Sequence, residues 1–88
     1  MGATLFLLTQ HALDRYLDRV GPMPRDTARR TILDATGDAR LSRERTKLGL
    51  WRWLVPSLQI ELICKRDRGC PGWVVVTLWP LEPAEAAE

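Results

Sequence analysis

The sequence predicts an α+β protein in which two N-terminal helices pack on an antiparallel sheet of three to four strands. Residues 10–36 carry apolar side chains at the spacing of amphipathic helices, whereas after Gly37 the apolar side chains alternate with polar ones. The third observation is the apolar run Trp73–Trp79 near the end of the chain. Helices first and strands afterwards are typical of an α+β fold.

The first helix is expected over Gln10–Val20. Thr9 is a good N-cap for it, and Gly21 followed by Pro22 ends it, because glycine supplies a terminating conformation and proline cannot continue a helix. The segment Ala3–Leu8 before it is compatible with a short N-terminal strand.

The second helix is expected over Pro24–Thr36. Pro24 suits the first turn, Asp26 lies near the positive helix end, and Gly37 closes the helix. The linker between the helices is short, so we expect the two to pack against one another.

Three later segments are expected to form strands. Within Leu48–Val55, Trp51, Trp53 and Val55 alternate with Leu50, Arg52 and Leu54. Residues 58–64 place apolar side chains opposite Gln59 and Glu61, as in a half-buried strand. Trp73–Trp79 is apolar on both faces and is expected in the centre of the sheet. Arg40–Lys47 is either another short strand or a mobile basic loop. The predicted core contains Leu13, Tyr16, Leu17, Val20, Ile32, Leu58, Ile60, Leu62, Val74 and Val76.

The 88 residues, 45% hydrophobic and 27% charged, suit a single small folded domain over residues 1–81. Residues 82–88 contain three glutamates and little to bury, so an acidic flexible tail is expected there. The formal net charge of +2 therefore hides a more basic folded body, whose cations are mostly arginine. Arginine favours bidentate contacts with phosphate, and this hints at a nucleic-acid partner.

Neither a targeting segment nor a cofactor site is predicted. The apolar run Leu5–Leu8 is too short for a signal peptide or a membrane span, so a cytoplasmic protein without a membrane partner is expected. Cys64 and Cys70 are expected as free thiols, and with one distant histidine they make no convincing metal site.

A cationic stripe runs along the first predicted helix. His11, Arg15 and Arg19 are spaced i, i+4 and i+8, while Asp14 and Asp18 form a separate strip beside them. An imidazole beside guanidinium groups can hold a phosphate and move a proton near neutral pH. The alternative is a solvated outer helix face.

The stretch from Leu8 to Arg19, the two helices and the late Val-Val-Val-Thr-Leu-Trp-Pro strand resemble small toxins of the RelE/barnase-like superfamily. The resemblance covers most of residues 9–80. It implies metal-independent ribonuclease chemistry, with His11 as general acid/base, Arg15 and Arg19 stabilising the phosphate and Thr77 orienting a phosphate oxygen, or else a non-catalytic relative.

A second candidate set is expected to bind nucleic acid. Trp51 and Trp53 share one face of a predicted strand and suit base stacking, helped by Arg43, Arg45 and Arg52 nearby. Packing in the core is the alternative role of these tryptophans.

Two function classes follow from these observations. The first is a small RNA-acting protein, a metal-independent ribonuclease of the toxin type whose partners are RNA and an antitoxin. The second is a non-enzymatic phage-type interaction or inhibitor protein that binds a host protein or a nucleic-acid complex.

Overall fold

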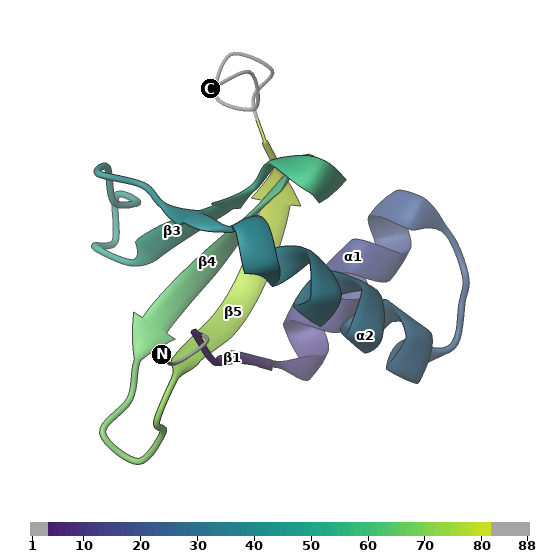
Figure 1. Cartoon of the computed structure of the whole chain (residues 1–88), viewed down its shortest axis with the longest axis horizontal. Helices are drawn as coiled ribbons and strands as arrows, with labels where there is room; N and C mark the ends of the chain where they lie inside the picture. The colour runs from purple at the N-terminus through teal and green to yellow at the C-terminus, as the bar shows by residue number, and fades with distance from the viewer. Residues whose placement is uncertain (1–3, 82–88) are drawn as a thin grey trace.

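The computed structural model describes residues 4–81, which form two helices on one face of a five-stranded mixed sheet (Figure 1). The helices are α1 (Gln10–Val20) and α2 (Arg25–Ala35), followed by the 3-10 turn η1 (Thr36–Asp38). The strands are β1 (Phe6–Leu8), β2 (Arg40–Leu41), β3 (Trp51–Val55), β4 (Ile60–Arg66) and β5 (Trp73–Pro80), with the 3-10 turn η2 (Pro56–Leu58) between β3 and β4. The α+β class is confirmed. The sheet order is β1-β5-β4-β3-β2.

Local capping explains the position of α1. The Thr9 hydroxyl accepts a hydrogen bond from the Ala12 N–H (3.2 Å) and donates one to the Val75 carbonyl (2.8 Å), so one side chain both caps the helix and ties it to β5. Gly21 ends the helix at φ +101°, a conformation that favours glycine. The predicted helix over Gln10–Val20 is confirmed, and α2 differs from its predicted bounds by one residue at each end.

The predicted antiparallel sheet of three to four strands is confirmed in part: β2, β3, β4 and β5 pair antiparallel and the possible N-terminal strand forms as β1, but the sheet is mixed. β1 joins the sheet and runs parallel to β5, with Phe6 opposite Trp73 and Leu8 opposite Val75. A Cβ at Gly72 would lie 2.8 Å from the Leu5 Cβ, so the two segments meet where no side chain intervenes. The apolar sequence of β1 contains no signal for its partner or direction, because that pairing joins the two ends of the folded chain.

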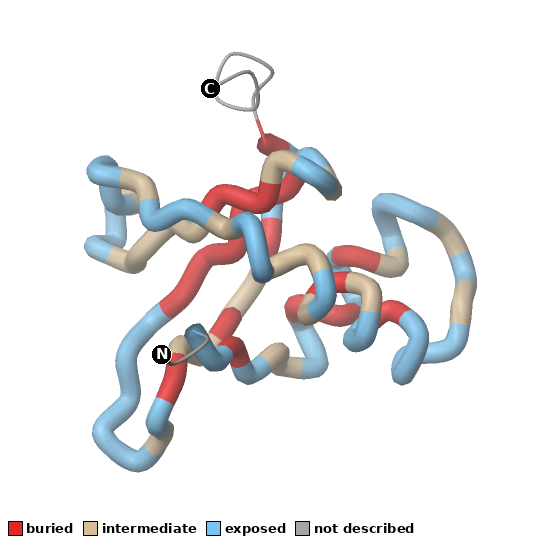
Figure 2. The backbone as a smooth tube through the Cα atoms, in the orientation of Figure 1, coloured by how far each residue is buried: buried red, intermediate tan, exposed pale blue. Residues whose placement is uncertain are grey.

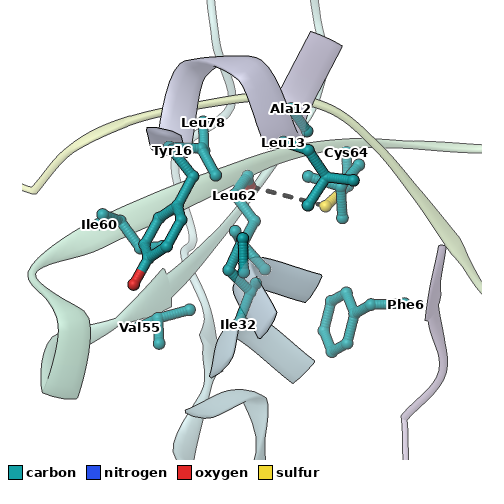
Figure 3. Packing of buried hydrophobic residues seen from close by; sticks show 12 residues of the cluster. Phe6, Ala12, Leu13, Tyr16, Ile32, Val55, Ile60, Leu62, Cys64 and Leu78 are labelled. Carbon is teal, nitrogen blue, oxygen red and sulfur yellow. Dashed lines mark hydrogen bonds between the residues drawn. The ribbon is translucent and has the colours of Figure 1, made fainter. Parts of the chain in front are cut away.

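The core lies between the helices and the sheet (Figures 2 and 3). Leu13 and Ile32 from the helices pack with Ile60 and Leu62 from β4, and all four side chains are at most 1% exposed. Of the other predicted core residues, Tyr16 is buried, whereas Leu17, Leu58, Val74 and Val76 are half-buried. Val20 is a wrong prediction: it is 46% exposed, because it is the last residue of α1 and the chain turns away at Gly21.

β4 is buried on both faces, not on one as predicted. Glu61 and Ile63 point away from the helices yet are 6% and 1% exposed. The strand begins at Ile60, since residues 56–58 form η2, and the predicted strand over Leu48–Val55 begins at Trp51.

A bulge between β4 and β5 changes which residues of β5 share a face. Cys64 lies opposite Val75, whereas Ile63 lies opposite Thr77, so the register shifts between these pairs. Residues directly opposite in an antiparallel pair lie on the same face. Val75 therefore faces the helices with Cys64, whereas Thr77 and Trp79 face away from them.

Candidate nucleic-acid interface

The face of the sheet opposite the helices carries Thr77 and Arg52 from the candidate residues. The strand register places two rows across it, the first formed by Arg40, Leu54, Glu61 and Trp79 and the second by Arg52, Ile63 and Thr77. We call this surface the open face. The segment between β2 and β3 projects beside it, away from α1 and α2 (Figure 1).

Two adjoining hollows lie on the open face and share Arg52. The first has a volume of about 510 Å³ and is lined mainly by apolar atoms; we call it the apolar hollow. The second has a volume of about 680 Å³, is lined mainly by polar atoms, and is called the basic hollow. The apolar hollow is lined by Arg45, Thr46, Lys47, Leu48, Leu50, Arg52, Ile63, Thr77 and Trp79, and the basic hollow by Arg40, Leu41, Ser42, Arg43, Glu44, Arg52 and Leu54.

Arg52 is held in place by Glu61. Its Nη2 donates to the Glu61 Oε2 at 2.5 Å, and the side chains are 13% and 8% exposed. An ion pair with this little solvent is costly to desolvate and requires good geometry to form. The carboxylate thus fixes a guanidinium at the boundary between the two hollows.

The remaining cations are Arg40 of β2 and three residues of the loop between β2 and β3, which are Arg43, Arg45 and Lys47. All four are exposed and, within residues 4–81, form no ion pair. The Arg45 guanidinium carbon lies 3.5 Å from the centre of a Trp51 ring, which orients this side chain by a cation–π contact. Glu44 is the one carboxylate that lines either hollow in the described part of the chain, so the surface is strongly cationic.

An ordered turn holds a large apolar side chain in solvent at the apolar hollow. The Gly49 N–H donates to the Thr46 carbonyl (2.9 Å), and the Leu50 N–H donates to the Thr46 hydroxyl (3.0 Å). Gly49 has φ +82°, so the turn favours glycine there. Leu48, between them, is 88% exposed.

The structure keeps three predicted catalytic residues together and separates the fourth. His11, Arg15 and Arg19 lie on α1, and Arg15 and Arg19, but not His11, line a hollow of about 390 Å³ with Asp18, Leu78 and Pro80. Asp14 pairs instead with Arg25 of α2, and the Arg19 Nη2 donates to the Gln59 carbonyl at 3.4 Å. Thr77 lies across the sheet, in the apolar hollow.

The predicted nucleic-acid set is likewise divided between the two faces. Trp51 and Trp53 face the helices, where they form edge-to-face contacts with Trp73 at 5.5 and 5.6 Å between ring centres. Phe6 extends this cluster to Trp53. Arg43, Arg45 and Arg52, in contrast, line the two hollows.

The described residues offer no metal cluster, and the thiol of Cys64 is buried. Residues 4–81 contain no group of three or more histidine, cysteine or acidic side chains placed to hold a metal ion. Burial raises the pKa of the Cys64 thiol to about 12, and its Sγ contacts the Leu62 carbonyl at 3.6 Å (Figure 3). Cys64 and Cys70 are both free. In the same part of the chain, neither helix has the length and apolar character needed to cross a membrane.

Comparisons with protein-family models, with curated proteins and with solved structures found no match for this chain. The resemblance to RelE/barnase-like toxins therefore stands on the sequence pattern alone.

Sequence reasoning missed Glu61, Leu48 and Trp79 as residues of the site. Arg52 lies between Trp51 and Trp53 in an alternating strand, which already indicates that it faces away from them. A glutamate inside the apolar segment 58–64 is the matching signal, since a buried carboxylate needs a partner.

Proposed function

We propose that this protein binds RNA on the open face of the sheet. The observation that carries the proposal is the adjoining pair of hollows, one basic and one apolar, that share the fixed guanidinium of Arg52. Phosphates are held by arginine and lysine, whereas bases are held on apolar and aromatic surfaces, so the two environments match the two parts of a nucleotide.

The charges around the hollows favour a polyanion. Arg40 and Arg43 line the basic hollow, and Arg45 and Lys47 line the apolar one. Contacts to several phosphates release counterions, so binding of this kind weakens steeply with salt. Binding of a host protein, which is the alternative function, does not depend on contacts with phosphates.

The test is the affinity of the purified protein for a fluorescently labelled single-stranded RNA, measured by anisotropy over a salt series. The double variant Arg40→Gln/Arg43→Gln is expected to bind about tenfold or more weakly at low salt. The plot of log binding constant against log salt concentration is expected to become less steep by about 1.4, which is about 0.7 for each phosphate that the variant no longer neutralises.

A matched control separates a local site from overall charge. Arg29→Gln/Arg30→Gln removes two exposed cations from α2, in the helical layer on the other side of the sheet. The control is expected to bind nearly as well as the wild type. Equal weakening in both double variants, or no binding by the wild type, would contradict the proposal.

A second candidate function is metal-independent RNA cleavage at α1, favoured by the hollow that Arg15 and Arg19 line with Asp18, Leu78 and Pro80. His11 would move the proton, and the two arginines would stabilise charge on the scissile phosphate. Incubation with total RNA in EDTA tests this. His11→Ala is expected to abolish cleavage and Gln10→Ala to retain it. An inactive wild type would leave α1 without a catalytic role.

A further inference from the structure

We infer that the apolar hollow is a slot for one unpaired base, so that the protein selects single-stranded over double-stranded RNA. This inference rests on the proposed function and assigns a ligand to the part of the surface that phosphate contacts do not explain. The walls of the apolar hollow are Leu48, Leu50, Ile63 and Trp79, with Thr77 beside them.

The walls of the hollow suit a flat, weakly polar group. Trp79 is 40% exposed and Leu48 is 88% exposed, so two large apolar side chains border a space that solvent reaches. The volume of about 510 Å³ lies within the range of about 300–1,000 Å³ that is usual for small-molecule sites. Stacking on an indole is a sequence-tolerant way to bind a base, because every base has a π-face.

The charges at the hollow indicate that this group is attached to an anion. Lys47 lines the same hollow, and Arg52 joins it to the basic hollow. An RNA strand repeats a phosphate with every base, so it can place a base in one hollow and a phosphate in the other. An apolar protein segment would fill the walls but would offer these cations no anion.

Pairing decides which RNA can use the slot. A base in a duplex is already stacked and paired, and bringing it out of the helix costs free energy, whereas a base in a single strand is free to turn outward. The Thr77 hydroxyl is available in the hollow to hydrogen-bond an exposed base edge. The apolar hollow therefore recognises an unpaired base and the basic hollow its phosphate.

The experiment compares three labelled RNAs on the intact protein: a single strand, its duplex, and a strand of the same length in which the bases are removed. The single strand is expected to bind about 5- to 150-fold more tightly than the strand without bases, which is the range that stacking of one base provides. The duplex is expected to bind like the strand without bases.

Two variants test whether the difference in affinity between the natural strand and the strand without bases arises in the apolar hollow. Trp79→Ala and Leu48→Ala are each expected to weaken binding of the single strand about fivefold or more and to leave binding of the strand without bases unchanged. Trp79→Phe keeps an aromatic face and is expected to restore most of the difference. Leu7→Ala, at a 39% exposed position on β1, is the matched control.

The outcomes separate the inference from the proposed function. If the natural strand and the strand without bases bind equally well, the slot is overturned and binding through phosphates stands. If Trp79→Ala and Leu48→Ala weaken both strands alike, or weaken neither, the slot is also overturned. If neither strand binds the wild type, the inference falls together with the proposed function. Leu48→Ala keeps the test decisive if Trp79→Ala does not fold, because Leu48 makes little contact with the core.

Discussion

Arg52 and Glu61 present two opposite charges on neighbouring strands in a place with little water. Their side chains are 13% and 8% exposed, so each charge depends on the other for the interactions that solvent would otherwise supply. Replacing such a pair by apolar residues is often neutral for stability, whereas removing one partner is costly. A pair of this kind at the boundary of two hollows is consistent with a role in positioning Arg52.

Removing Glu61 alone is expected to destabilise the protein because it deprives the guanidinium of Arg52 of this carboxylate. Glu61→Leu should lower the free energy of unfolding by about 3 kcal/mol or more, and the double variant Arg52→Leu/Glu61→Leu should recover most of that decrease. Urea denaturation of the wild type, both single variants and the double variant measures this coupling. Additive decreases in the double variant would contradict the interpretation of a coupled pair.

The same experiment distinguishes stability from binding. The double variant is expected to fold but to bind RNA more weakly than the wild type, because the cation shared by the two hollows is gone. A double variant that is stable and binds RNA normally would show that Arg52 has only a structural role.

Among the elements, the helices were predictable because their signals are local. Thr9 caps α1 through the Ala12 N–H, and Gly21 ends it with a positive φ, so both signals lie within one turn of the helix ends. The positions of both helices follow from capping and periodicity, and tertiary contacts do not change them.

The sheet was predictable in part, because strand partners are far apart in sequence. Alternation located β3 and β4 to within a few residues. It could not reveal that β1 pairs with β5, or that a bulge at Ile63/Cys64 turns Thr77 away from α1. The resemblance grouped Thr77 with the α1 stripe, and the shifted register places Thr77 on the other face of the sheet instead.

The close approach of β1 and β5 at Gly72 makes a specific prediction at this scale. Gly72 is buried, and a Cβ there would lie within 2.8–2.9 Å of the Leu5 Cβ and carbonyl carbon. Gly72→Ala should therefore push β1 from the sheet and lower stability by about 1–3 kcal/mol, as overpacking does. Amide hydrogen exchange should rise at Thr9, whose N–H donates to the Val75 carbonyl, and at Trp73, whose N–H donates to the Leu5 carbonyl.

Gly37→Ala provides the control for that change. No atom of the described residues lies within 4 Å of a Cβ built at Gly37, and its φ is not in the left-handed region. This variant is expected to be as stable as the wild type or slightly more stable. Equal effects of the two alanine variants would contradict a steric role for Gly72.

At the scale of the whole molecule, charge and fold together define the candidate site. The sequence alone located the cations, and the loop between β2 and β3 supplies several of them, as the basic segment Arg40–Lys47 suggested. The sequence could not show that this loop and the open face together line two hollows. Those hollows depend on which residues of three strands share a face, which is a property of the assembled sheet.

The distribution of charge along the chain makes the last prediction. The predicted acidic tail, residues 82–88, lies outside the described residues, but its sequence contributes Glu82, Glu85 and Glu88 to a chain whose net charge is only +2. A chain ending at Leu81 would keep every lysine and arginine and would carry three fewer negative charges. Its attraction for a polyanion should therefore be stronger at low salt.

Deletion of residues 82–88 is expected to tighten binding of single-stranded RNA several-fold at low ionic strength, with the gain shrinking as salt shortens the screening length to about 10 Å at 0.1 M. The full-length triple variant Glu82→Gln/Glu85→Gln/Glu88→Gln should reproduce the gain, because it removes the charges and keeps the segment. Anisotropy titrations over a salt series measure both. A gain from the deletion that the triple variant lacks, or that persists at high salt, would point to exclusion by the segment itself and contradict an electrostatic cause.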